Sequence, residues 1–304
     1  MNKKRLALTL LLISMMLFGC IAICKRSLTD AGLSSFDVTF IRLFIATVVL
    51  AAVMLIGHQE FYFNKKDIPF FILFGACKFL SDYTYFMALE TTSVSLATVL
   101  QNTAPYFVLL ISYFIFKEKV SKKTMLAILV GSFGCVLICA RTISGTSLDP
   151  IGILFSLLSA LFLGMFYIGS DKSMKRGYDA AMYMFYVMAV ATVISLLFTD
   201  VPKVVSSMSD ASVLVNSLIL GVLMTLVPFY ISAWAVRYLG ALNVTVISVT
   251  EVVFATIVGV AYFNESIELP DIIGIVLMIV SVVLIATASN DGPDGQVPET
   301  ESVS

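Results

Sequence analysis

The chain has 304 residues and a formal net charge of −1, and 59% of its residues are apolar while only 13% are charged. A soluble domain is about half apolar and about a quarter charged, so this composition excludes an ordinary water-soluble protein. The near-neutral charge gives no reason to expect nucleic acid as a partner. We therefore expect an all-α integral membrane protein whose solvent is the lipid bilayer.

Ten apolar stretches are long enough to cross a bilayer as helices, because about 20 helical residues span a hydrocarbon core of about 30 Å. In chain order they cover residues 6–24, 37–57, 68–89, 92–116, 124–140, 151–170, 178–198, 213–236, 241–263 and 271–288. The first stretch follows Lys3, Lys4 and Arg5 and resembles a signal peptide. We expect it to remain as the first helix, because it is long for a signal sequence and many spans follow it.

The basic residues of the connections predict how the chain lies in the membrane. Of the 19 Lys and Arg residues, Arg42 and Lys78 lie within spans. With the N-terminus inside, the outer connections hold only Lys25, Arg26, Arg141 and Lys203, and the other 13 lie in cytoplasmic segments. Because cytoplasmic loops are enriched in Lys and Arg, we expect a multi-pass cell (cytoplasmic) membrane protein with both termini cytoplasmic. The Gly-, Pro- and acid-rich tail 289–304 is predicted to be a disordered cytoplasmic segment.

The two halves of the chain resemble each other at a fixed offset of 147 residues. Phe116-Lys117-Glu118 pairs with Phe263-Asn264-Glu265, and the same offset pairs Thr98 with Thr245. This predicts two five-helix units, 1–140 and 141–288. Since five is odd, the second unit enters the membrane from the opposite side. Such inverted repeats are common among secondary transporters, where they allow the binding site to open to either side.

Several of these segments resemble a known family. Ala97 to Ile138, with Pro105, Phe116-Lys117-Glu118 and Gly131-Ser132-Phe133-Gly134, resembles an EamA domain, and Phe40 to Ala46 resembles the Arg-containing second helix of that domain. The chain is thus similar to the EamA-domain transporters of the drug/metabolite transporter (DMT) superfamily over roughly residues 6–288. In the second half Val252 stands where the first has Pro105, which argues against a matching helix break there.

The resemblance implies a fold and an activity. The fold has ten transmembrane helices in two inverted five-helix repeats. It encloses a central cavity lined mainly by helices 1–4 and 6–9, while helices 5 and 10 are peripheral. The implied activity is that of a permease, and bacterial members of the superfamily include exporters of amino acids and other metabolites.

Few ionisable side chains lie within the spans, and each costs at least about 2.5 kcal/mol to insert, so each should face the bundle or a wet cavity. Arg42 is either a structural arginine near the interface or a contact for a carboxylate or another anion. Lys78 and Asp82 either neutralise each other within one helix or exchange partners with substrate, and Tyr85 continues their face. Glu251 is either a hydrogen-bonded structural acid or a group that binds a proton or a cation.

Polar stripes follow the fourth and ninth helices. Thr98, Gln101 and Asn102 recur at helical spacing, and Thr245 and Ser248 take the positions offset by 147 from Thr98 and Gln101. We interpret the stripes as two walls of a binding site at the membrane midplane. Hydrogen bonding between helices is the alternative interpretation.

Prolines and aromatic residues complete the candidate site. Pro105 and Pro228 each remove a backbone donor and free a carbonyl, so both are candidate hinges. Tyr230 and Trp234 lie one turn apart beside Pro228 and are candidate cavity-wall residues. They would contact an apolar or aromatic part of a substrate, or a cation through the ring face.

The leading hypothesis is a secondary active transporter, an exporter of small metabolites such as amino acids or amphipathic compounds. It would work by alternating access and be coupled to protons. A non-transporting membrane scaffold or sensor and, less favoured, an intramembrane enzyme are the alternatives. We do not expect an enzyme, because motifs such as HExxH and GxSxG are missing. His58 and the five cysteines lack metal-ligand spacing, so we expect no metal and no cofactor.

The expected partners are a small-molecule substrate and the lipid bilayer, with the protein a monomer or a homodimer. Ala127, Gly131 and Gly134 form a smooth face on the fifth helix. Such a face allows two helices to approach closely, either within the bundle or between two copies of the chain.

Overall fold

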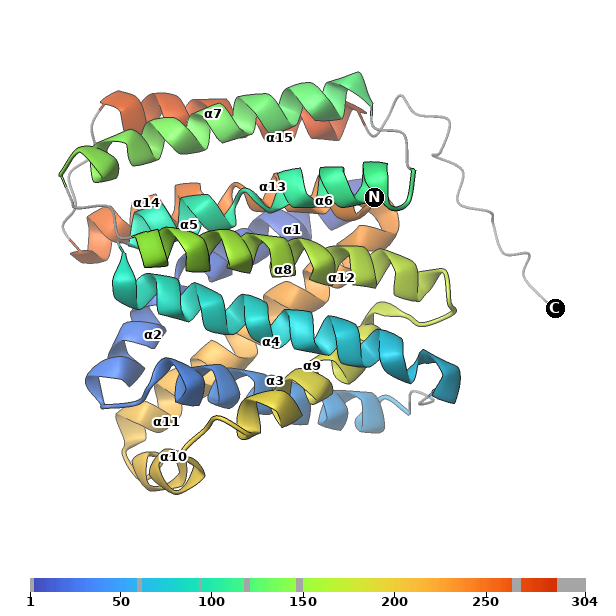
Figure 1. Cartoon of the computed structure of the whole chain (residues 1–304), viewed down its shortest axis with the longest axis vertical. Helices are drawn as coiled ribbons and strands as arrows, with labels where there is room; N and C mark the ends of the chain where they lie inside the picture. Colours follow the sequence, from blue (N-terminus) through green and yellow to red (C-terminus); the bar gives the residue numbers. More distant parts are fainter. Residues whose placement is uncertain are drawn as a thin grey trace.

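The computed structural model describes residues 3–58, 62–92, 94–117, 121–145, 150–263 and 269–288. This part of the chain is helical throughout and contains no strand. Long helices lie side by side as a bundle (Figure 1). The predicted all-α class is thus confirmed, while the tail 289–304 lies outside the described residues.

Each predicted stretch overlaps at least one helix, and the stretches 6–24, 92–116, 213–236 and 241–263 are each divided into two or more helices. The first half comprises α1 (Lys3–Gly19), α2 (Ile21–Asp30), α3 (Ser35–Ile56), the 3-10 helix η1 (Lys65–Asp67), α4 (Ile68–Thr91), α5 (Val94–Gln101), α6 (Ala104–Phe114) and α7 (Lys122–Gly145). The second half comprises α8 (Pro150–Met174), α9 (Ala180–Leu196), α10 (Val201–Ser207), α11 (Ala211–Leu218), the π-helix η2 (Ile219–Leu226), α12 (Val227–Leu239), α13 (Ala241–Ser248), α14 (Glu251–Phe263) and α15 (Leu269–Ala288).

Length and apolarity identify fewer membrane spans than the sequence analysis predicted. Five described stretches are long and apolar enough to cross a membrane: Lys3–Asp30, Ser35–Ile56, Pro150–Met174, Ala211–Leu239 and Ala241–Val258. The pair α9 and α10, bent by 106°, would make a sixth. The first stretch runs to Asp30, beyond the predicted end at residue 24. The presence of several membrane-spanning helices is clear, and the number ten stays a prediction.

One end of the bundle is defined by contacts between the connections that follow α3 and α8. Arg176 forms an ion pair with Asp67. The Tyr178 hydroxyl donates to Asp67 Oδ2 at 2.9 Å. Lys172, near the end of α8, lies 3.8 Å from the ring centroid of Phe116, which follows α6. The connections after α3, α6 and α8 therefore lie at the same end.

The opposite end is defined by contacts among the segments that follow α2, α4 and α9. Lys25 Nζ lies 3.2 Å from Glu90 Oε1 near the end of α4. Asp37 closes a capping box with Ser34 at the start of α3, and its Oδ1 also accepts from the backbone N–H of Asp200, 3.1 Å away. Since α1 and α2 run toward this end and α8 runs away from it, the first helices of the two halves have opposite directions.

Small residues bring pairs of helices close together. α7 and α15 lie against each other along one edge of the bundle (Figure 1). The Ser281 hydroxyl donates to the backbone carbonyl of Ala127 at 2.8 Å, and a Cβ on Gly131 would lie 2.8 Å from Ser281 Oγ. The predicted smooth face of this helix therefore packs within the bundle.

The N-terminal helix is an integral part of the bundle. α1 packs against α12 and α14. A Cβ on Gly19 would lie only 2.8 Å from Phe254 Cβ, so a larger residue at position 19 would force the two helices apart.

Candidate functional site

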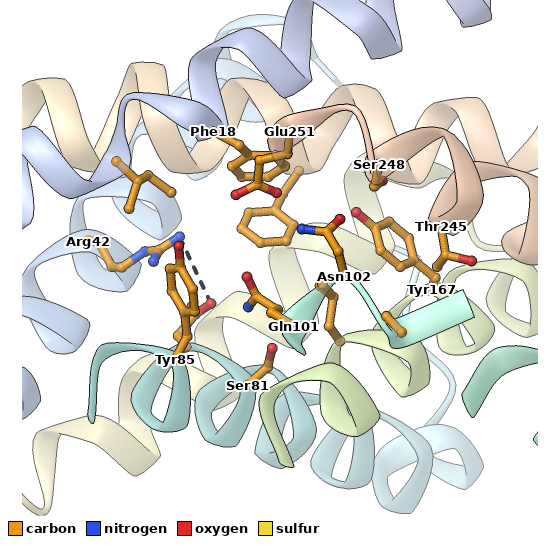
Figure 2. A pocket seen from close by; sticks show the side chains of 15 residues that line it. Phe18, Arg42, Ser81, Tyr85, Gln101, Asn102, Tyr167, Thr245, Ser248 and Glu251 are labelled. Carbon is orange, nitrogen blue, oxygen red and sulfur yellow. Dashed lines mark ion pairs between the residues drawn. The ribbon is translucent and has the colours of Figure 1, made fainter. Parts of the chain in front are cut away.

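A polar cavity lies between helices of both halves (Figure 2). Its walls come from α1 to α6, α8 and α12 to α14, and from the break between α5 and α6. The lining residues are Phe18, Ile21, Arg42, Ser81, Asp82, Tyr85, Gln101, Asn102, Ala104, Leu163, Tyr167, Phe229, Thr245, Ser248 and Glu251. The cavity therefore brings together eight of the residues that the sequence analysis singled out.

The cavity is narrow in this conformation. The space open to the centres of water-sized molecules is about 30 Å³. Each water needs about 10–15 Å³ by this measure, so the cavity has room for about two waters. A metabolite would fit only if the surrounding helices moved apart.

The charged end of the cavity is built around Asp82. Lys78 Nζ donates to both oxygens of the Asp82 carboxylate at 2.6 Å. Arg42 Nη2 lies 3.9 Å from Asp82 Oδ1, and Figure 2 marks this ion pair with a dashed line. The pairing of Lys78 with Asp82 within α4 agrees with the structural interpretation of these two residues.

Lys78 lies behind the cavity wall. Its side chain is fully buried, and its ammonium lies 3.6 Å from the ring centroid of Phe229, which does line the cavity. A ligand would therefore meet Asp82 and Phe229 before it could reach Lys78.

Arg42 is held in place by both halves of the chain. Its side chain projects from α3, is 1% exposed and donates from Nε to the Thr225 hydroxyl at 3.1 Å. Thr225 belongs to the π-helix η2 and itself donates to the carbonyl of Leu220 at 2.6 Å. Arg42 Nη2 is buried and has no hydrogen-bond partner among the described residues.

Glu251 lies across the cavity from Arg42. It is the first residue of α14 and is 9% exposed, and its carboxyl group points into the cavity (Figure 2). Among the described residues, no Lys or Arg nitrogen lies within 4.0 Å of this carboxyl. Glu251 is therefore an acid that faces the interior of the cavity and has no close counter-ion among the described residues.

Hydroxyl and amide groups occupy the remaining walls. Tyr85 Oη lies 3.0 Å from Thr98 Oγ1, so Thr98 positions Tyr85 from behind the wall. The Gln101 amide donates to Ser159 Oγ at 2.8 Å, and Asn102 donates to the carbonyl of Thr98 at 2.8 Å. These contacts fix the α5 side of the cavity.

The second stripe faces the cavity from α13. Thr245 and Ser248 donate their hydroxyl protons to carbonyls of their own helix at 2.8 and 2.9 Å. Their oxygens keep the capacity to accept a further hydrogen bond. In Figure 2 they lie with Tyr167 at the end of the cavity away from Arg42.

The expectation that the ninth helix has no break matching the one beside Pro105 is wrong. α5 ends at Gln101 and α6 begins at Ala104, while α13 ends at Ser248 and α14 begins at Glu251. The second break forms without proline, because Val252 takes the place of Pro105. The two breaks therefore have another feature in common.

That shared feature is a threonine at each break. Thr103 Oγ1 donates to the carbonyl of Leu100 at 2.6 Å, and Thr250 Oγ1 donates to the carbonyl of Ile247 at 2.8 Å. Both donors and both acceptors are 147 residues apart. A threonine hydroxyl that bonds to the preceding turn competes with the helix ladder and favours a bend.

The predicted hinge at Pro228 coincides with a change of helix type. Pro228 stands in the first turn of α12, directly after η2. Single π-helical turns within α-helices are frequent at functional sites, and η2 spans eight residues, Ile219–Leu226. The proline marks the end of this segment, and Thr225 near that end contacts Arg42.

Tyr230 and Trp234 do not line the central cavity, so their predicted role as its wall is wrong for this conformation. They line a second, wider cavity of about 410 Å³ together with Tyr178, Asp179 and Arg237. Tyr230 is 36% exposed there, and Trp234 packs on Tyr238 with ring centroids 4.8 Å apart. This cavity lies near the end of the bundle marked by Arg176.

Four lining residues that carry polar or aromatic side chains were missed from the sequence. Ser81 lies one turn from both Lys78 and Tyr85 and shares their face, so the periodicity could have found it. Phe229 adjoins Pro228. Tyr167 and Phe18 lie in apolar helices where the sequence offers many similar aromatic residues.

The sequence matches a family profile in both halves. The profile is described as the EamA-like transporter family, and it matches residues 5–140 and again residues 150–287. Together the two matches cover most of the chain.

Curated relatives support the same grouping. A Clostridium kluyveri protein is 26% identical over 284 residues, which cover 90% of this chain and 91% of the relative. An Archaeoglobus fulgidus protein is 25% identical over 278 residues, which cover 90% of this chain and 94% of the relative. Both bear the name "uncharacterized transporter". A solved crystal structure superposes with a TM-score of 0.73 at 17% identity, covering 93% of this chain and 97% of the other, and so shares the fold.

Proposed function

Because the chain belongs to the EamA-like transporter family, we propose that it is a secondary active permease that exports a small metabolite by alternating access. The observation that carries this proposal is the buried polar cavity enclosed by broken helices of both halves. In a membrane, irregular backbone is tolerated where it is covered by protein or lines a wet cavity. The substrate would be an amino acid or another small polar or amphipathic compound.

The proposed topology has ten spans in two inverted repeats, 1–140 and 141–288, with both termini on the cytoplasmic side of the cell membrane. Two observations support it. The first helices of the halves run in opposite directions, and the breaks at Thr103 and Thr250 are 147 residues apart. If each half can adopt the shape of the other, exchanging the two shapes moves the opening from one side to the other.

We further propose that Glu251 couples transport to protons. A carboxyl group within a membrane bundle is costly to maintain and usually marks an ion pathway. Glu251 faces the cavity, and among the described residues it has no cation within ion-pair distance. It can therefore take up and release a proton as the cavity changes sides. The scaffold or sensor alternative gives this arrangement no role.

The first test is transport by the purified protein in proteoliposomes. Radiolabelled amino acids, monocarboxylates, nucleosides and cationic drugs would be offered with and without a pH gradient. We expect at least one class to move, and we expect Glu251→Gln to abolish acceleration by the gradient while the protein stays folded. Asp171→Asn, at the end of α8 outside the cavity, is the control. No movement of any class would contradict the transporter proposal, and unchanged gradient dependence in Glu251→Gln would remove Glu251 from coupling.

A further inference from the structure

Arg42, which lines the central cavity, has a hydrogen-bonding group that is not used. An arginine side chain carries five N–H donors in a planar fork. Nε is bonded to Thr225, while Nη2 is buried without a partner among the described residues. Its distance of 3.9 Å to Asp82 Oδ1 is too long for a hydrogen bond. A buried polar group without a partner requires an explanation, and a missing ligand supplies one because Arg42 lines the cavity.

The charges around the cavity point to the sign of that ligand. Lys78 binds both oxygens of Asp82 at 2.6 Å and so uses the nearest carboxylate. Glu251 is outside ion-pair distance of Arg42. Among the described residues, the carboxylate nearest to the Arg42 guanidinium is therefore Asp82, which lies 3.9 Å away, beyond hydrogen-bond distance, and is already bonded to Lys78. An anionic ligand would give Arg42 a hydrogen-bonded counter-ion.

The shape of the donor group points to the kind of anion. A guanidinium fork matches the two oxygens of a carboxylate and binds them through two parallel hydrogen bonds. The fork is fixed in orientation by Thr225 and packs beside the Phe86 ring, whose centroid lies 5.1 Å from Arg42 Cζ. A rigid, dry donor of this kind favours a planar anion with a single charge.

We propose that Arg42 binds the carboxylate of the transported metabolite, which makes the central cavity selective for small monocarboxylates. This proposal rests on the proposed transport function. The carboxylate would approach Nη2, and the rest of the ligand would lie against Phe18 and Phe229 and reach the hydroxyls of Thr245 and Ser248. Asp82, held by Lys78, lies beside the guanidinium on the cavity wall, 3.9 Å from Nη2.

The first experiment measures binding by wild-type protein and therefore does not depend on any variant folding. Butyrate, 3-hydroxybutyrate and phenylacetate would be compared with their primary amides by thermal shift and equilibrium binding in detergent. Each amide keeps the carbon skeleton and loses the charge. We expect each acid to bind about ten- to hundredfold more tightly than its amide, as for loss of a charged hydrogen bond. Equal binding of acids and amides, or tighter binding of inorganic phosphate, would overturn the proposal.

The second experiment compares two conservative substitutions of arginine. Arg42→Lys keeps the charge and removes the fork, and Arg176→Lys makes the same change at the end of the bundle, outside the cavity. We expect the preference for acids over amides to fall about tenfold or more in Arg42→Lys and to stay unchanged in Arg176→Lys. An unchanged preference in a folded Arg42→Lys protein would assign Arg42 a structural role and overturn the proposal.

The two proposals fail in different ways. If proteoliposomes move amides or cations and Arg42→Lys does not alter that movement, carboxylate selectivity is wrong while transport stands. If acids bind through Arg42 but no compound crosses the membrane, the anion site stands as a sensor site and the transport proposal is wrong.

Discussion

Asp82 stabilises two buried cations, Lys78 at 2.6 Å and Arg42 at 3.9 Å. Removing its charge would leave both cations in a dry environment. Breaking a buried ion pair by removing one partner costs about 3–5 kcal/mol. We therefore expect Asp82→Asn to lower the unfolding temperature of the detergent-solubilised protein strongly.

The matched control for Asp82→Asn removes both charges of the pair. In Lys78→Met with Asp82→Leu, neither Lys78 nor Asp82 leaves an unpaired buried charge, so we expect the part of the loss that comes from Lys78 to return while Arg42 still lacks Asp82. If Asp82→Asn is as stable as the wild type, the pair is not structural. If the double variant folds but no longer transports, the pair also has a functional role.

The cost of burying polar groups is what made many site residues predictable. Arg42, Asp82, Glu251 and the stripe residues Gln101 and Ser248 are conspicuous in an apolar helix, and the cavity gathers them all. Aromatic residues carry no such signal, because the bundle and the lipid interface also hold them.

Tyr230 and Trp234 were assigned to the cavity because they lie beside Pro228, and proximity to a proline does not fix the face of a helix. Successive residues of an α-helix project about 100° apart. Phe229 therefore lines the central cavity while Tyr230 and Trp234 line the second one.

At the scale of the element, the threonines at the two helix breaks are the feature shared by both halves. We expect Thr103→Val and Thr250→Val to favour continuous helices, because each loses the hydroxyl that bonds to the preceding turn. Transport should fall severalfold while the unfolding temperature stays the same or rises. Transport rates in proteoliposomes and thermal unfolding would measure the two effects.

Thr256→Val is the control for these substitutions. Thr256 also donates its hydroxyl proton to a backbone carbonyl, that of Val252 at 2.8 Å, but this acceptor is four residues back and not three, and the bond lies inside the uninterrupted helix α14. Equal losses of transport in Thr250→Val and Thr256→Val would show that the break is not the element that moves.

The break in the second half shows why a single residue type is a poor predictor of helix geometry. Proline interrupts a helix by removing a donor, and its replacement by Val252 argued for continuity. The hydroxyl of Thr250 provides a different local bond with a similar result. The match of Thr103 with Thr250 at the repeat offset is the feature that the two breaks share in the sequence.

At the scale of the whole molecule, the polar residues that form the site also lower the apolarity by which membrane spans are recognised. α4 carries Lys78, Asp82 and Tyr85 and is not among the five stretches that pass on length and apolarity. The span containing α5 and α6 is interrupted beside Gln101. The opposite directions of α1 and α8 agree with the repeat offset, which depends on many positions and not on the apolarity of one segment.

Aromatic contacts hold three segments together at the end of the bundle marked by Lys25 and Glu90. Phe36 stacks on Tyr83 with ring centroids 4.0 Å apart and on Phe198 at 5.4 Å. These rings connect α3, α4 and the segment after α9. Lys25 and Ser35 both bind Glu90 at the same end, at 3.2 and 2.5 Å. Opening the cavity toward this end requires these contacts to separate.

We therefore expect Phe36→Ala to shift the protein toward a form open at this end. A cysteine introduced by Ile21→Cys, in a background without the native cysteines, would report the opening from within the cavity wall. Reaction with a membrane-impermeant thiol reagent added outside should become severalfold faster, because a ring stack of this kind contributes about 0.5–1.5 kcal/mol. The control is Phe44→Ala, which removes a ring stacked on Phe40 from the exposed face of the same helix. If Phe44→Ala accelerates the reaction to the same extent, the ring stack of Phe36 does not keep this end closed. If the reaction becomes faster only from the opposite side of the membrane, this end does not face outward as the proposed topology requires.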